Sequence, residues 1–182
     1  INPVTLADSG TYTCEITNTV ATDLTLYSRP VNITVEVTLC EMISNWEDIT
    51  PPWESSAPGT FIVDTVENPD KTGINPSDSC AKLTTTTDNN EFMWYDLPDG
   101  EIWSFNTHPV YKLMVNAPTE GDIVLRFVNS DLTAGVNRFA HYSNPGLWEE
   151  LVFDFTGVAL DSLIRMVVYP DYGGTTEGNE WY

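Results

Sequence analysis

The stretch Val66–Cys80, with the sequence VENPDKTGINPSDSC, decides the fold of this chain when it is read with two later segments. These are Leu147–Phe155, LWEELVFDF, and Met166–Gly174, MVVYPDYGG. The first stretch and the end of the third are rich in Asn, Pro, Asp and Gly, the residues that form turns. Each segment alone is ordinary turn or strand chemistry, so the information lies in their order and spacing along the chain.

Strands rather than helices are predicted from Thr38 onward. Short runs of β-branched and aromatic residues alternate there with turn clusters, and no segment shows a sustained 3.6-residue periodicity. The fold class that we predict is therefore all-β, with two sheets packed as a sandwich. We expect strands at Leu39–Ile43, Thr60–Thr65, Ser79–Thr85, Phe92–Leu97, Val110–Asn116, Ile123–Asn129, Asn137–Ser143, Trp148–Phe155 and Leu163–Tyr169.

Alternation along the predicted strands indicates which side chains face the core. In the strand Trp148–Phe155, every second residue is a large apolar one, and the side chains between them include two acidic groups. The same pattern in the strand Ile123–Asn129 places Arg126 away from the core, and Lys112 is expected to project outward from its own sheet. The residues expected in the core of these two strands are Leu125, Phe127, Leu151, Phe153 and Phe155.

The first part of the chain carries a different signature. Asp8–Cys14 reads DSGTYTC, with Tyr two residues before Cys, which is typical of the tyrosine corner and strand F of an immunoglobulin fold. Residues 1–37 are therefore predicted to be the C-terminal part of an immunoglobulin-like domain. Strand F is expected over Thr11–Asn18 and strand G over Leu26–Val37, with a break or bulge at Pro30. We expect the earlier strands of that domain to come from a longer polypeptide of which this chain is a piece.

Three motifs follow one another along the chain. They are the Asn-Pro-Asp-x-Thr-Gly-x-Asn loop of Asn68–Asn75, the Trp-Glu-Glu-Leu strand and the late Pro-Asp-x-Gly turn. Together they resemble the galactose-binding-like, jelly-roll carbohydrate-binding modules of secreted bacterial polysaccharide-degrading proteins. The resemblance covers 38–182 and implies a jelly-roll domain whose last strand lies beyond Tyr182. It implies a non-catalytic binder in a secreted or cell-surface multidomain protein.

An alternative function is a structural repeat unit of an extracellular adhesin, stalk or filament. Its partners would be neighbouring copies or domains of a longer chain. A carbohydrate binder needs exposed aromatic side chains on one face, whereas a structural unit needs none. The two interpretations are therefore separated by the exposure of the aromatic residues.

The charge of the chain limits its partners. Lys and Arg number 7 against 27 Asp and Glu, so the formal net charge is -20 at pH 7. Such a negative surface disfavours nucleic acid, anionic membranes and anionic polysaccharides, and favours a neutral polysaccharide or glycan. No stretch approaches the ~18 apolar residues of a membrane span. The 2 histidines, His108 and His141, lie in no catalytic or metal-binding motif, so we predict that the protein is not an enzyme.

Aromatic side chains are the candidate sugar platforms, because their faces stack on the C–H side of pyranose rings. The chain has 6 Trp, although most aromatic residues of a sandwich belong to its core. Trp94 and Tyr95 are adjacent in one predicted strand, point to opposite faces, and cannot both be buried by the same core. The predicted carbohydrate-binding residues are Trp94, Trp103, Tyr142 and Arg126.

The resemblance also implies a structural calcium site. Asn45–Asp48 resembles the Asn-Phe-Glu-Asp of the family at the end of the first strand, and other ligands are expected in the Asn68–Asn75 loop. The predicted ligands are Glu47, Asp70 and Asn75, which offer the oxygen atoms that Ca²⁺ prefers. The alternative is that these residues only form turns.

Cysteine spacing rules out a zinc motif, because the 3 cysteines contain no C-x-x-C pair. Cys40 and Cys80 are predicted to form a disulfide if the domain is extracellular, and two free buried thiols are the alternative. Cys14 has no expected partner in this chain.

Overall fold

The computed structural model describes residues 8–17, 19–20, 25–34, 42–49, 52–56, 63–88, 90–98, 103–129, 133–160 and 162–182. The chain divides into two compact units, Ile1–Glu41 and Met42–Tyr182, close to the predicted boundary between residues 37 and 38. All regular elements of the described ranges are β-strands, which confirms the predicted fold class. Within these ranges, no helix is long and apolar enough to cross a membrane.

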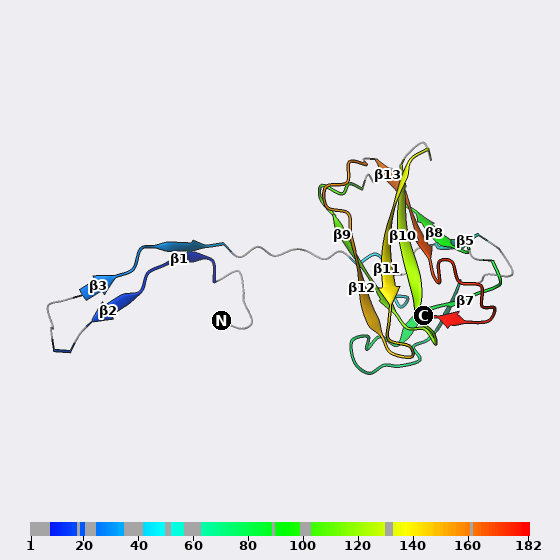
Figure 1. Ribbon diagram of the computed structural model, residues 1–182, viewed down its shortest axis with the longest axis horizontal. Coiled ribbons are helices and arrows are strands. Elements are labelled where there is room, and N and C mark those ends of the chain that lie inside the picture. Colours follow the sequence, from blue (N-terminus) through cyan, green and yellow to red (C-terminus); the bar gives the residue numbers. More distant parts are fainter. Residues whose placement is uncertain are drawn as a thin grey trace. The chain divides into compact units, whose positions relative to one another are not determined.

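The first unit contains two antiparallel strand pairs (Figure 1). β1 (Gly10–Tyr12) pairs with β4 (Val31–Ile33), and β2 (Glu15–Thr17) pairs with β3 (Thr25–Tyr27). The Tyr12 hydroxyl donates a 2.8 Å hydrogen bond to the Asp8 carbonyl, as is expected of a tyrosine corner. The immunoglobulin-like identity of this unit remains a prediction.

One layer of the second unit is a five-stranded antiparallel sheet with the order β11-β10-β13-β8-β5. We call it the five-stranded sheet. Its strands are β5 (Glu54–Ser55), β8 (Met93–Asp96), β10 (Gly121–Asn129), β11 (Gly135–Tyr142) and β13 (Leu163–Tyr169).

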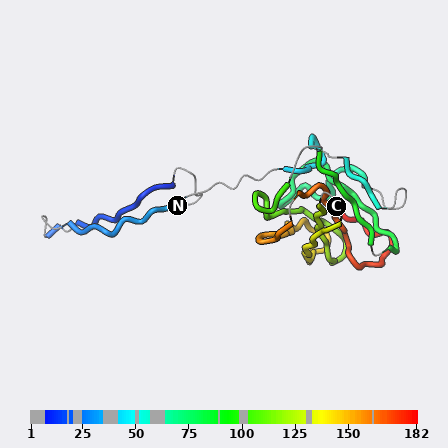
Figure 2. The backbone as a smooth tube through the Cα atoms, turned by 90° about the horizontal axis from the view of Figure 1, so that it is seen from above, coloured from blue at the N-terminus to red at the C-terminus, as the bar shows by residue number. Residues whose placement is uncertain are grey.

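The other layer contains two groups of strands that meet at the C-terminus (Figures 1 and 2). The groups are β6-β7-β14 and β9-β12. Their bounds are β6 (Val63–Glu67), β7 (Ser79–Thr84), β14 (Glu180–Trp181), β9 (Val110–Val115) and β12 (Glu149–Asp154). Tyr182 and Asn116 exchange two backbone hydrogen bonds of 2.8 and 3.0 Å, which connect the end of β14 to the end of β9.

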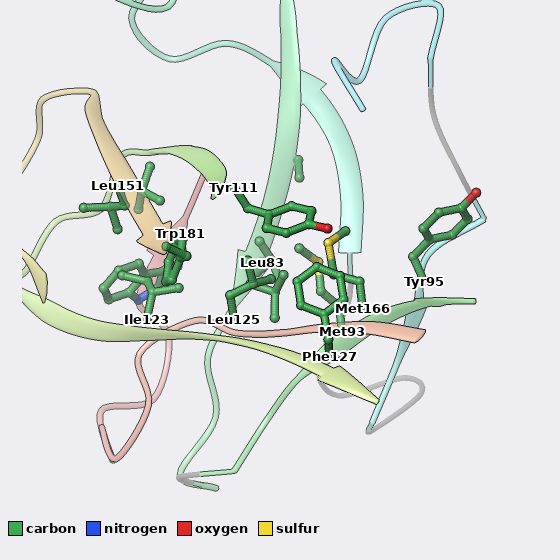
Figure 3. Packing of buried hydrophobic residues seen from close by; sticks show 14 of the residues in the cluster. Leu83, Met93, Tyr95, Tyr111, Ile123, Leu125, Phe127, Leu151, Met166 and Trp181 are labelled. Carbon is green, nitrogen blue, oxygen red and sulfur yellow. The ribbon is translucent and has the colours of Figure 1, made fainter. Parts of the chain in front are cut away.

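The core lies between the two layers. Figure 3 shows Leu125 and Phe127 from β10 in one packed cluster with Tyr111 from β9 and Leu151 from β12. All five residues that alternation placed in the core are buried: Leu125, Phe127, Leu151, Phe153 and Phe155. Burial of these side chains is the main favourable term that holds the layers together.

The predicted strands from Thr60 onward all have counterparts, with ends shifted by a few residues. β5 and β14 were not predicted, because two-residue strands are too short to show alternation. The predicted strand at Leu39–Ile43 lies mostly outside the described residues. Met42 and Ile43, at its end, are not in a strand.

Asn68 joins two of the segments that predicted the fold. Its side chain is 4% exposed, and its Nδ2 donates to the carbonyls of Asn75 and Ser77 at 3.0 and 2.9 Å. Its Oδ1 accepts bonds from the Asp70 amide at 2.9 Å and from the Trp148 indole Nε1 at 3.1 Å. The loop is thereby closed on itself and attached to the beginning of β12.

Asn68→Ala is expected to lower the free energy of unfolding by about 1 to 3 kcal/mol, because it leaves buried carbonyl and amide groups without partners. Urea unfolding of the full chain measures this loss. Asn106→Ala, at an exposed turn position, is the matched control and should change little. Equal effects of the two substitutions would contradict the role given to Asn68.

Candidate functional site

The outer face of the five-stranded sheet is the side away from the core. Aromatic, arginine, histidine and acidic side chains lie together on it. Pairing registers align residues of its five strands in one row across this face: Asn137 opposite Arg126, Arg126 opposite Val167, Val167 opposite Trp94, and Trp94 opposite Glu54. Neighbouring strands lie about 4.8 Å apart, so Arg126 and Trp94 are separated by about 10 Å on either side of Val167.

Five aromatic side chains on this face form a continuous series, which we call the aromatic row. The ring centroids of Trp94 and Phe92 are 5.6 Å apart, and those of Phe92 and Tyr169 are 5.1 Å apart. Tyr169 contacts Tyr172, and Tyr172 contacts Phe139, both at 5.7 Å. These distances are within the range of favourable aromatic pairs.

The aromatic row is partly open to solvent. Phe139 is 59% exposed and Tyr172 is 40% exposed, whereas Val124 on the same face is 0% exposed. Val124 is paired in register with Phe139 on one side and Tyr169 on the other, so the larger aromatic rings shield it. The result is an apolar strip with its exposed surface concentrated at the Phe139 end.

Two arginines flank the row. Arg126 donates a 3.0 Å hydrogen bond from Nη1 to Asn137 Oδ1. Gly135 makes room for this side chain, because a Cβ atom there would lie 2.6 Å from an Arg126 guanidinium nitrogen. The Arg165 guanidinium lies 5.4 Å from the centroid of the Trp94 ring and donates two hydrogen bonds to the Asp96 carboxylate, which raises the pKa of Arg165.

An acidic pair with a histidine lies at the Phe139 end of the sheet. His141 Nδ1 is 2.7 Å from Asp122 Oδ1, and His141 Nε2 is 3.8 Å from Glu120 Oε2. The hydrogen bond to Asp122 is the main cause of a raised pKa for His141. This end of the face therefore offers both hydrogen-bond donors and acceptors.

The structure separates the predicted carbohydrate-binding residues. Trp94 and Arg126 lie on the outer face, and Trp94 is half-buried beneath Arg165. Trp103 is partly buried against the core, where its ring stacks with Tyr111 at a centroid distance of 6.3 Å. Lys112 pairs with Glu150 in the other layer, so it does not share a face with Arg126.

The prediction for Tyr142 is wrong. Its side chain is 0% exposed, so no sugar ring can stack on it. Its hydroxyl accepts a bond from the Ala117 amide at 3.2 Å and lies within hydrogen-bonding distance of the Ala117 and Leu147 carbonyls. Residue alternation along β11 places Tyr142 on the inner face of the strand. Its ring therefore packs in the core, and its hydroxyl is a hydrogen-bond partner for the backbone of the adjacent turn.

Four members of the aromatic row were missed. Alternation already placed Phe92 on the face of Trp94, and Phe139 on that of Asn137, but sequence alone did not show which strands are neighbours. Tyr172 lies in a turn after β13, where alternation carries no information. The missed residues are Phe92, Phe139, Tyr169 and Tyr172.

Two of the predicted calcium ligands, Asp70 and Asn75, take part in local turns, whereas Glu47 bonds to a residue distant in the sequence. Their oxygen atoms accept hydrogen bonds as follows: Glu47 from the Asp78 amide, Asp70 from the amide and hydroxyl of Thr72, and Asn75 from the Ser77 hydroxyl. The bonds from Thr72 lower the pKa of Asp70. In the part of the chain that the structure describes, no group of three or more His, Cys, Asp or Glu is arranged to hold a metal ion. Calcium at these residues remains a prediction.

The predicted disulfide involves one residue outside the described ranges, Cys40. Its expected partner, Cys80, is buried in β7, and burial raises the pKa of the Cys80 thiol to about 11. The pairing remains a prediction.

No protein-family model matches the sequence, and no similar curated protein was found. A solved structure is similar, described as "Structural basis for the promiscuous specificity of the carbohydrate-binding modules from the beta-sandwich super family". The TM-score is 0.54 at 12% identity, and the match covers 96% of this chain and 72% of that chain. The fold is a β-sandwich. At this identity the likeness establishes the fold alone.

The pair of His141 and Asp122 predicts a pH effect that NMR titration of the imidazole can measure. A raised folded-state pKa means that the pair stabilises the fold fully below the usual histidine value of about 6.5, and that this contribution is lost as pH rises through the folded-state pKa. Asp122→Asn should bring the His141 pKa back toward the usual value. A titration curve unchanged by Asp122→Asn would contradict the pairing.

Proposed function

We propose that the outer face of the five-stranded sheet binds a neutral glycan without cleaving it, in a secreted or cell-surface multidomain protein. The observation that carries the proposal is the aromatic row, whose exposed members Phe139 and Tyr172 are in contact with each other. Soluble domains seldom leave joined aromatic side chains open to water without a binding role.

The chemistry of the face suits a sugar. Aromatic rings can stack on the apolar C–H side of a pyranose, while its hydroxyls need hydrogen-bond partners at the edge of the ring. Arg126 and Asn137 lie beside the row and provide a guanidinium and an amide. Asp122 and His141 provide an acceptor and a donor at its exposed end.

The charge of the protein supports a neutral ligand. A formal net charge of -20 repels sulfated or uronic-acid polymers, and only salt would reduce that cost. Two arginines on the face do not reverse this balance, because Arg165 is paired with Asp96.

Two finer features belong to the proposal. The sandwich is a galactose-binding-like jelly roll, which is supported by the order of the three sequence segments and by the likeness to a β-sandwich carbohydrate-binding module. The first unit is part of an immunoglobulin-like domain, which is supported by the hydrogen bond from Tyr12 to Asp8.

Phe139→Ala and Tyr172→Ala are each expected to weaken binding of a neutral polysaccharide by roughly threefold to tenfold, because each removes one stacking surface. Affinity electrophoresis of the full chain through gels with and without each polysaccharide measures this change. Val152→Ala is the control, since Val152 is 50% exposed on β12 in the other layer.

The result that would contradict the proposal is retardation by no neutral polysaccharide. Equal losses in Phe139→Ala and Val152→Ala would place the binding site elsewhere. Retention of soluble, folded protein in all variants, judged by circular dichroism, keeps the comparison valid.

A further inference from the structure

The rings of the aromatic row do not form one flat surface. Successive ring planes along Trp94, Phe92 and Tyr169 are tilted by 46° and 44°. The ring of Tyr172 is tilted by 90° against Tyr169 and by 76° against Phe139. An ordered polysaccharide surface presents many sugar rings in one plane, so only coplanar aromatic rings can stack on several of them at once. The row therefore does not match such a surface.

The Trp94 end of the row is already covered. The Arg165 guanidinium lies over the Trp94 ring, 5.4 Å from its centroid, and its hydrogen bonds to the Asp96 carboxylate hold it there. A cation in this position occupies a ring face on which a sugar would stack. The indole Nε1 of Trp94 is buried as well, so a sugar hydroxyl cannot reach it. Stacking is thereby restricted to the other end of the row.

That other end is formed by Phe139 and Tyr172, which we call the aromatic corner. The two rings are 59% and 40% exposed, whereas the other rings of the row are half-buried. Because their planes meet at 76°, they enclose an angle in which one pyranose can stack on one ring and touch the other. The Tyr172 amide donates a 2.6 Å hydrogen bond to the Asp122 carbonyl, which attaches the turn that carries Tyr172 to β10.

Polar side chains lie on both sides of Phe139 along β11. Asn137 and His141 are two residues away in either direction, so they leave the same face of the strand at about 7 Å from Phe139. The register places Arg126 beside Asn137 and Asp122 beside His141. The side chains of Asp122 and His141 are 55% and 56% exposed, so both are accessible to a ligand at the corner.

We propose that the aromatic corner binds one pyranose of a soluble neutral glycan, and that Asp122 and His141 bind its hydroxyls. One oxygen of the Asp122 carboxylate is bonded to His141, and the second oxygen can accept from a hydroxyl. The ligand class is a dissolved oligosaccharide or a single chain, not the flat surface of a crystalline polysaccharide. This inference rests on the proposed function and specifies the form of its ligand.

A series of oligosaccharides of increasing length tests the single stacking position. NMR titration of the full chain with neutral mono-, di-, tetra- and hexasaccharides of glucose, mannose, galactose and xylose measures each Kd. In a series that binds, the Kd corrected for the number of sugars per molecule should change by less than about twofold from the disaccharide to the hexasaccharide, because no further ring is open for stacking. Microcrystalline cellulose and chitin should not deplete the protein from solution.

Two further measurements locate the ligand. The hexasaccharide should shift the backbone amide signals of Phe139 and Tyr172 and leave the indole N–H signal of Trp94, assigned with Trp94→Phe, in place. Asp122→Ala should weaken binding by roughly tenfold, because a charged hydrogen-bond acceptor is lost. Asp64→Ala removes an exposed carboxylate from β6 in the other layer, so it is the matched control and should leave the Kd unchanged.

Three outcomes overturn the inference and leave the proposed function intact: a Kd that falls severalfold with each added sugar, a shift of the Trp94 indole signal together with the Phe139 amide, or depletion by a crystalline polysaccharide. An unchanged Kd in Asp122→Ala overturns the role of the acidic pair. Absence of binding to every neutral glycan, soluble or crystalline, overturns the proposed function and this inference together. The length series requires no substitution, so it decides even if Asp122→Ala does not fold.

Discussion

The antiparallel register between β8, β13 and β10 is the constraint on which the rest of this domain depends. It sets Met93 and Phe127 on one side and Trp94 and Arg126 on the other, because successive side chains of a strand alternate. A slip of one residue in any of these pairings would exchange core and surface side chains. Burial of the apolar side chains in the core fixes the register, and the register in turn determines which residues lie on the outer face.

The same register also explains why a small hollow lies next to the aromatic row. The strands β8 and β13 run in opposite directions, so the beginning of one meets the end of the other, where the buried Glu91 and the turn at Asp171 line one hollow. The aromatic row crosses the sheet beside them and continues onto Tyr172 of the same turn. The hollow and the aromatic row are thus connected through consecutive residues, Asp171 and Tyr172.

The sequence predicted the features that depend on local periodicity. It predicted less well the features that depend on contacts between segments distant in the sequence. Alternation in the strand that became β12 placed Phe153 in the core, and turn residues placed the loop around Asn68. Alternation separates Tyr142 from Phe139 on β11 but does not show which of the two faces is buried, so Tyr142 was assigned to the surface although it is buried. For the same reason Phe139, one of the most exposed aromatic residues of the face, was overlooked.

Gly135 has a consequence for how proteins with this sheet could diverge. The Arg126 side chain lies directly where a side chain at position 135 would begin. Any larger residue there would push the guanidinium away from Asn137 without altering an aromatic ring or a core residue. A single inherited change at this glycine would thus displace a polar group of the face, while the aromatic row lies outside the contacts of a Cβ atom at this position. For the proposed glycan site, such a change would alter a hydrogen-bonding group without removing an aromatic side chain.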